Sequence, residues 1–170
     1  MIEITKYLQT VYEDLQRYVD NDVCLCKFKE LNFEAGALPD YEDINIQQLY
    51  LLRYAFAYAF EYSRMYLDVL SQMDGVNGIS VTSVGCGSMI DYWSLVHALE
   101  MKRKIDCSIR YVGIDKIDWS YKIPKRQNDE VHYLIGNAAD VFAHNSQFIS
   151  NVYFFPKSIS EFSDGELNAM

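Results

Sequence analysis

The stretch Ile79-Ser80-Val81-Thr82-Ser83-Val84-Gly85-Cys86-Gly87-Ser88-Met89 decides the fold of this 170-residue chain. Its first six residues form a short β-rich run, and a pair of glycines with one residue between them follows directly. Glycine lets the backbone turn sharply and lets a ligand approach main-chain atoms without meeting a Cβ. The stretch therefore predicts a strand, a glycine turn and a helix, with a cofactor site at the turn. A purely structural turn between a strand and a helix is the alternative.

Further strands and helices alternate along the second half of the chain. We expect strands over 79–84, 108–114, 131–135 and 152–155, and a helix over 90–103. Strands that alternate with helices indicate a parallel sheet. The predicted fold class is α/β, with a Rossmann-like parallel sheet of strand order 3-2-1-4 and an N-terminal helical extension.

Residues 1–75 are expected to form that extension. Apolar residues recur with helical spacing over 4–19, which predicts an amphipathic helix. The segment 20–43 is interpreted as an irregular connection. A second helix is expected over 45–73, with the Asn45 side chain capping its first turn.

Tyrosines recur at every fourth position of this second helix. They are Tyr50, Tyr54, Tyr58, Tyr62 and Tyr66. Residues at this spacing form a stripe that drifts slowly around a helix. We interpret the helix as buried between the N-terminal helix and the sheet domain or a partner, and an aromatic ligand site is the alternative.

A carboxylate ends the second predicted strand, in Tyr111-Val112-Gly113-Ile114-Asp115. In a doubly wound sheet this strand end lies beside the glycine turn, where a carboxylate can accept hydrogen bonds from ribose hydroxyls. Asp115 is therefore the strongest single candidate for a binding residue. An aspartate that only caps the next turn is the alternative.

Four motifs follow one another in the second half of the chain. They are the strand ending in Val84-Gly85-Cys86-Gly87-Ser88, then Val112-Gly113-Ile114-Asp115, then Tyr133-Leu134-Ile135-Gly136-Asn137-Ala138, and then Val152-Tyr153-Phe154-Phe155-Pro156. In this order they resemble the motifs of class I S-adenosylmethionine-dependent methyltransferases. The order of the motifs is more specific than any one of them.

The resemblance implies a site for S-adenosylmethionine. In such a site Gly85 and Gly87 pass close to the methionine part of the cofactor and Asp115 binds the ribose. Asn137, or Asp140 in its place, is implied to reach the adenine amino group. Asp118 or Trp119 is implied to lie near the adenine, in the loop that follows Asp115. Catalytic residues stay unassigned, although Lys157, Ser158 and Glu161 are candidates by location.

The chain departs from the pattern of this family at several positions. Ser83 stands where the family usually has an acidic residue, and Met89 stands at the position of a third glycine. The family fold has three further strands after the fourth, so we expect residues 76–170 to form an incomplete methyltransferase-type domain. An open strand edge favours pairing with another chain. Self-association or a partner chain is therefore predicted, at the open sheet edge or at the aromatic helix.

These features lead to one leading function and two alternatives. The leading hypothesis is an S-adenosylmethionine-binding, methyltransferase-like protein whose acceptor is unknown. The alternative is a non-catalytic interaction module, or an incomplete fragment, built on the same scaffold. A nicotinamide-dependent enzyme is disfavoured because Ile90 occupies the third glycine position of G-x-G-x-x-G, where it would obstruct close packing of helix and strand.

Composition narrows the class of partner. A formal net charge of -9 disfavours non-specific binding to nucleic acid, which depends on neutralising phosphates. The sequence shows neither a signal peptide nor an apolar run of membrane-spanning length, so a cytoplasmic protein without membrane contact is expected. The 4 cysteines and 3 histidines lack the spacing of metal ligands, and no metal is expected.

Overall fold

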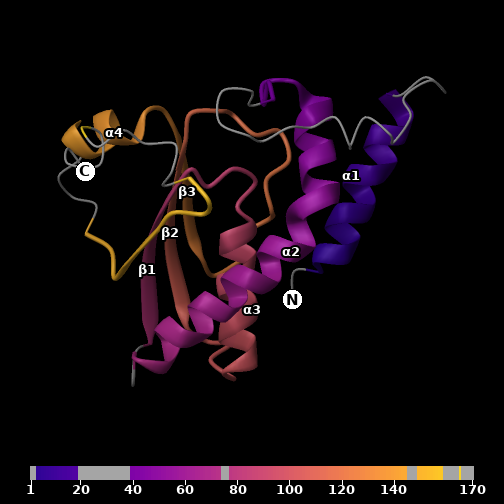
Figure 1. The fold of residues 1–170 in the computed structure, drawn as a ribbon. Helices are drawn as coiled ribbons and strands as arrows, with labels where there is room; N and C mark the ends of the chain where they lie inside the picture. The colour runs from indigo at the N-terminus through magenta and orange to yellow at the C-terminus, as the bar shows by residue number, and fades with distance from the viewer. Residues whose placement is uncertain (1–2, 19–38, 74–76, 145–148, 159–164, 166–170) are drawn as a thin grey trace.

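Four parallel strands form the central sheet, in the order β3-β2-β1-β4 (Figure 1). The computed structural model of the protein describes residues 3–18, 39–73, 77–144, 149–158 and 165. The strands are β1 (Gly78–Val84), β2 (Ser108–Asp115), β3 (Glu130–Ile135) and β4 (Val152–Phe154). This arrangement is Rossmann-like. The predicted α/β class and the predicted strand order are both confirmed.

The register of the sheet brings the carboxyl ends of three strands to one edge. Val84 at the end of β1 pairs with Ile114 of β2, and Asp115 pairs with Ile135 of β3. The turns that follow these strands are joined to the sheet by backbone hydrogen bonds, because Gly85 N donates to Ile114 O at 2.7 Å. The loops after β1, β2 and β3 therefore begin side by side.

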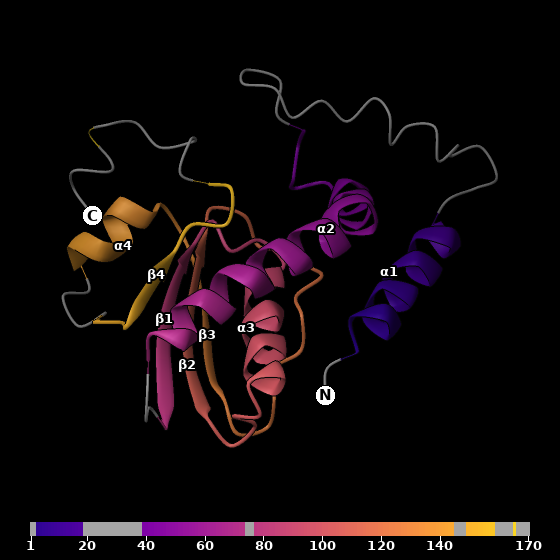
Figure 2. The same ribbon diagram turned by 60° about the horizontal axis from the view of Figure 1, so that its bottom comes forward.

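Helices cover the two faces of the sheet unequally (Figures 1 and 2). The helices are α1 (Ile4–Tyr18), α2 (Ile44–Ser71), α3 (Ile90–Met101) and α4 (Ala138–His144). Figure 2 shows α2 and α3 against one face, with α1 outside them, and the short α4 beside the opposite face. The N-terminal helices share one hydrophobic core with the sheet, which includes Val11 of α1, Leu51 of α2 and Val81 of β1.

The face beneath α4 is apolar only near the carboxyl ends of the strands. There Val84, Val112 and Ile114 pack with Ala138 of α4. Alternate residues of a strand point to opposite faces. On β2 the face of Val112 and Ile114 also carries Arg110, which is exposed. The apolar side chains on this face thus lie where α4 covers the sheet.

The start of the long helix differs from the predicted one. The N-cap of α2 is Asp43, which has an extended backbone and whose carboxylate accepts a hydrogen bond from Asn45 N at 2.8 Å. Asn45 therefore lies inside the first turn and is not the cap. Both residue types favour N-caps, and the extended backbone of Asp43 decides which of them has that role.

The predicted strands agree with the observed strands to within one residue at each end. The second helix ends at Ser71 and the third at Met101, each two residues before the predicted end. The helix α4 was not predicted. Most of the connection predicted over 20–43 lies outside the described residues. In the described ranges, no helix has both the length and the apolar character needed to cross a bilayer.

Candidate functional site

A cavity of about 230 Å³ lies at the carboxyl ends of the strands. It is lined by the loops after β1, β2 and β4, by the start of α4 and by tyrosines of α2. From β1 the chain continues to β2 and β3 on one side, whereas β4 lies on the other side of β1. The direction in which strands are added therefore changes between β1 and β4. Ligands of open α/β sheets bind at this kind of switch point, outside the carboxyl ends of the strands.

The glycine turn is shaped by the protein's own side chains. Gly85 has φ +73°, and a Cβ built there would lie 2.4 Å from the Cβ of Ser158. The Ser158 hydroxyl donates a hydrogen bond to Val84 O, which fixes the loop after β4 against the turn. Gly87 has φ +51°, and its Cβ would meet the ring of Trp119 at 3.4 Å. Both glycines line the cavity, and the fold requires Gly85 with or without a ligand.

The Asp115 carboxylate joins the glycine turn to the loop after β2. Its Oδ2 accepts a hydrogen bond from Gly87 N at 2.7 Å, and its Oδ1 accepts one from Ile117 N at 2.9 Å. Burial raises the pKa of Asp115 above its usual value, and the hydrogen bonds that it accepts oppose the rise. The side chain of Trp119 and the backbone of Lys116 also hydrogen-bond to this carboxylate. An ionised carboxylate has about four acceptor positions, so a ligand hydroxyl would share the carboxylate with these groups. Asp115 therefore caps the turn after β2, and this role is compatible with binding of a ligand.

The first turns of α2 hold the loop after β2 in place. Gln47 Oε1 accepts a hydrogen bond from Ser120 N at 2.8 Å, and Gln48 Nε2 donates to the Tyr121 hydroxyl at 2.6 Å. Both glutamines are buried. The indole of Trp119, in the same loop, is buried and lines the cavity, and its centroid lies 5.4 Å from that of the Tyr50 ring.

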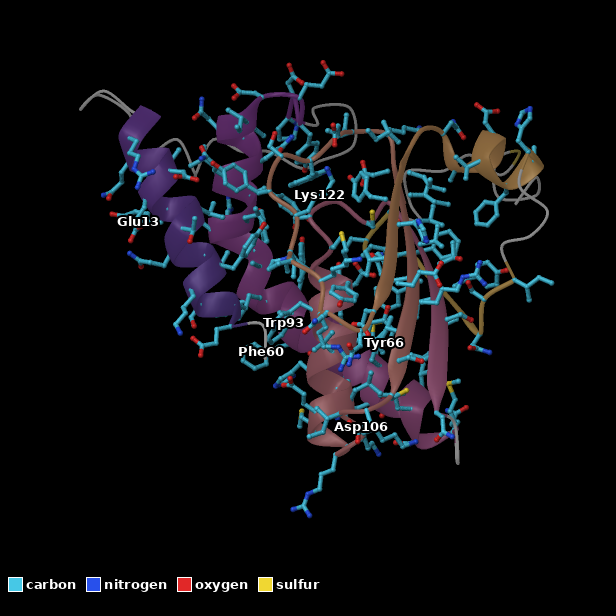
Figure 3. The ribbon with its side chains drawn as sticks, turned by 180° about the vertical axis from the view of Figure 1, so that it is seen from behind. Glu13, Phe60, Tyr66, Trp93, Asp106 and Lys122 are labelled. Carbon is cyan, nitrogen blue, oxygen red and sulfur yellow. The ribbon has the colours of Figure 1, made fainter. Side chains whose placement is uncertain are left out.

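The tyrosine stripe of α2 has two environments. Tyr62 and Tyr66 are buried and contact Phe154 of β4 at ring-centroid distances of 5.2 and 4.9 Å. Figure 3 shows Tyr66 on the side of α2 that faces the sheet. Tyr50, Tyr58 and Tyr62 line the cavity. The interpretation of a buried helix is thus right for part of the stripe, and the aromatic ligand site also has a geometric basis.

Asp91 lies at the floor of the cavity, and the sequence analysis did not single it out. It occupies the first turn of α3 and is 1% exposed. The Tyr111 hydroxyl donates to both of its oxygens, at 2.9 and 3.0 Å. Burial raises the pKa of Asp91 to about 6. The sequence showed only an acidic residue at a helix start, which is common, and the burial is a property of the tertiary structure.

Nucleophilic and metal chemistry have little support in the described residues. Cys86 lines the cavity, but burial raises the pKa of its thiol well above the usual value. The thiolate is the reactive form, so this cysteine is an inert thiol at neutral pH. Within the described ranges, no three histidine, cysteine, aspartate or glutamate side chains are grouped so that they could hold a metal ion.

The remaining candidates lie at the edge of the cavity or beyond it. Asn137 Oδ1 accepts a hydrogen bond from Ala139 N at 2.9 Å, at the start of α4. Asp140 is exposed on α4, and neither side chain lines the cavity. Asp118 is exposed and forms an ion pair with Lys122, which Figure 3 shows between α2 and the strands. The implied adenine contacts of these residues stay predictions.

A salt bridge links the loop after β4 to α2 beside the cavity. Lys157 Nζ lies 2.6 Å from Glu61 Oε1 and 5.8 Å from the centroid of the Tyr58 ring. Lys157 and Ser158, which were candidates by location, both line the cavity. Glu161 lies outside the described residues. The cavity is thus bounded by the sheet edge on one side and by α2 on the other.

The chain matches no profile of a known protein family, no curated protein and no solved structure with which it was compared. A Rossmann-like scaffold carries binders and enzymes of many kinds. The function is therefore inferred from the residues and the geometry of the cavity.

Proposed function

We propose that the protein binds S-adenosylmethionine in this cavity and acts as a methyltransferase-like protein. The observation that carries the proposal is the position of Asp115. Its carboxylate lines the switch-point cavity, accepts a hydrogen bond from the glycine turn and adjoins Trp119, whose ring packs against that of Tyr50. A carboxylate at the end of the second strand is placed to accept hydrogen bonds from ribose hydroxyls.

The residues of the cavity fit the parts of this cofactor by chemical type. Aromatic rings of Trp119 and Tyr50 offer flat apolar surface for a purine, and Asp115 offers acceptors for the ribose. The volume of about 230 Å³ is slightly below the roughly 300–1,000 Å³ of typical ligand pockets. Entry of the whole cofactor therefore requires side chains of the cavity lining, such as Tyr58 of α2 and Lys157, to shift.

The contribution of the protein to methyl transfer would be positioning. When bound, the cofactor supplies an electrophilic methyl group on a sulfonium. The tyrosines of α2 would exclude water from the cavity, and Asp115 would fix the orientation of the nucleoside. Correct placement of two reactants accounts for a large share of the barrier reduction in such reactions. The acceptor stays unassigned.

The first test is titration of the full chain with S-adenosylmethionine by calorimetry, with NAD as the control ligand. Asp115→Ala should weaken binding of S-adenosylmethionine by about ten- to a hundredfold, because a hydrogen bond to a charged group contributes roughly 1.5–3 kcal/mol. Asp106→Ala is the matched control, since Asp106 is exposed and lies beyond the opposite end of α3 (Figure 3).

A ligand variant separates the ribose role from damage to the loop. A cofactor analogue without the ribose hydroxyls should bind wild type more weakly than S-adenosylmethionine does, whereas Asp115→Ala should bind both ligands equally. Unchanged affinity of Asp115→Ala would remove the ribose role. If the folded wild type binds no S-adenosylmethionine, the proposed function is wrong and the interaction module becomes the better hypothesis.

A further inference from the structure

We propose that Asp91 makes the cavity selective for ligands that carry a positive charge. The inference rests on the proposed function and deepens it, because it concerns which end of the ligand reaches the floor of the cavity. The group recognised would be a cation, either a sulfonium or an ammonium. The observations that carry this step are the burial of Asp91, its uncompensated charge and the rings that surround the same space.

Asp91 is a buried carboxyl group that borders open space. Only 1% of the residue is exposed, yet it is part of the cavity lining. The groups that hydrogen-bond to it are the hydroxyls of Tyr111 and Ser83 and backbone groups of its own helix turn, and all of these donors are neutral. A buried carboxylate that faces a cavity and receives only neutral donors keeps a negative charge that a cation in the cavity can neutralise.

The described residues packed around Asp91 carry no compensating charge. Tyr62 and Tyr66 approach it from α2, Tyr111 from β2 and Cys86 from the glycine turn. Burial raises the pKa of each of these tyrosine and cysteine groups, so all of them are neutral at pH 7. Among the described residues, no ion pair includes Asp91.

An ionised side chain in this position is costly without a partner. Desolvation disfavours the charged form of a buried group unless it is paired. Burial raises the pKa of Asp91 to about 6, which leaves the carboxyl mostly ionised at neutral pH. A bound cation would relieve this cost, and the relief would appear as ligand affinity.

Aromatic rings in the same cavity favour the same kind of ligand group. Tyr62, which lies near Asp91, lines the cavity and stacks on Tyr58 with a centroid distance of 5.7 Å. The Tyr58 ring already has Lys157 Nζ at 5.8 Å from its centroid, so Tyr62 is the ring placed to act with Asp91. The face of an aromatic ring attracts a cation within about 6 Å of the ring centroid. The Asp91 carboxylate and the Tyr62 ring therefore act together on one charged group. An aspartate that only stabilises the start of α3 through the helix dipole would give no ligand preference.

Three ligands and one variant test this inference by calorimetry at neutral pH. S-adenosylmethionine carries a sulfonium and an ammonium, S-adenosylhomocysteine carries only the ammonium, and 5′-methylthioadenosine carries neither. Asp91→Asn should lower the affinity for S-adenosylmethionine by about tenfold or more. Its affinity for 5′-methylthioadenosine should stay within about twofold of the wild-type value. Equal weakening of S-adenosylhomocysteine would identify the ammonium as the bound cation, and an unchanged affinity for it would identify the sulfonium.

A pH series on the wild type provides an independent readout. A bound cation favours the ionised carboxylate, so affinity for S-adenosylmethionine should fall as pH decreases through about 6. Affinity for 5′-methylthioadenosine should stay constant over the same range, and Asp91→Asn should show no such dependence with either ligand. If the variant does not fold, the pH dependence of wild-type affinity alone decides whether Asp91 selects a cationic ligand or has only a structural role.

The outcomes that overturn the inference differ from those that overturn the proposed function. If the wild type binds S-adenosylmethionine and Asp91→Asn binds all three ligands as well as the wild type does, Asp91 has no selective role. An equal loss for all three ligands also overturns it, because the loss is then independent of charge. If the folded wild type binds none of the ligands, both proposals are wrong. Asp106→Asn is the matched control for removal of a carboxylate outside the cavity.

Discussion

Gly85 shows how a single residue type can be required by a contact that is remote in the sequence. Its backbone has positive φ, and Ser158 from the loop after β4 lies where a Cβ would be. Left-handed backbone costs a residue with a Cβ roughly 1–2 kcal/mol. The close approach of Ser158 adds a steric cost to that strain, because the Cβ–Cβ distance would be 2.4 Å.

Gly85→Ala should lower the free energy of unfolding by about 2 kcal/mol or more, as measured by urea denaturation. Gly87→Ala is the matched control, since its φ is also positive but its Cβ would make an ordinary contact with Trp119 at 3.4 Å. Gly87→Ala should lower the free energy of unfolding by less than Gly85→Ala does. Adding Ser158→Gly to Gly85→Ala should recover part of the stability. A loss no larger than that of Gly87→Ala would contradict the steric argument.

At the scale of elements, one buried ion pair ties α3 to the sheet. Asp129 accepts hydrogen bonds from Tyr92 of α3 at 2.6 Å and from Ile109 N of β2 at 3.1 Å. Arg126 binds both of its oxygens at 2.8 Å. The Asp129 side chain is 0% exposed and that of Arg126 is 17% exposed. One carboxylate therefore connects α3, β2 and the loop before β3.

Asp129→Asn should lower the free energy of unfolding by roughly 3–5 kcal/mol, because it leaves a largely buried guanidinium without its charged partner. Asp118→Asn, which breaks the exposed pair with Lys122, should cost less than about 1 kcal/mol. Thermal or urea unfolding of the two variants gives the comparison. Similar losses in both variants would show that the Asp129 pair contributes no more than a surface pair.

At the scale of the whole molecule, apolar surface remains on the outer side of α2. Phe60 is 71% exposed and Phe56 is 46% exposed, and these positions are neighbours on a helix. Figure 3 shows Phe60 on the side of α2 that points away from the sheet. In the sheet, no described strand pairs with the outer edge of β4. The expectation of a partner at the aromatic helix or the open edge stays a prediction.

Sedimentation velocity over a range of protein concentrations tests that prediction. Wild type should show concentration-dependent self-association, and Phe60→Ser should shift the distribution toward the monomer if α2 forms the contact. Ile105→Ser is the matched control, because Ile105 is 65% exposed and lies beyond the C-terminal end of α3. A monomeric mass for wild type at every concentration would contradict self-association.

The strands could be predicted because they depend on local signals, whereas their order follows from the doubly wound topology that the order of the motifs indicates. The β-rich run from Ile79 to Val84 and the glycines that follow it predict a strand and a turn. Alternation of strands with helices indicates a parallel sheet. The helix α4 escaped prediction because it spans 7 residues and has a single buried residue, Ala138. A helix this short depends on packing more than on sequence propensity.

The sequence by itself determined the α/β class, the strand order and the position of Asp115 beside the glycine turn, since each follows from short-range pattern and from the topology of parallel sheets. Only the tertiary structure decided that Ser158 fills the space at Gly85 and that Asp91 is buried beneath a cavity. These two properties depend on residues from distant segments meeting in space. Periodicity reports which residues share a face, but not what lies opposite that face.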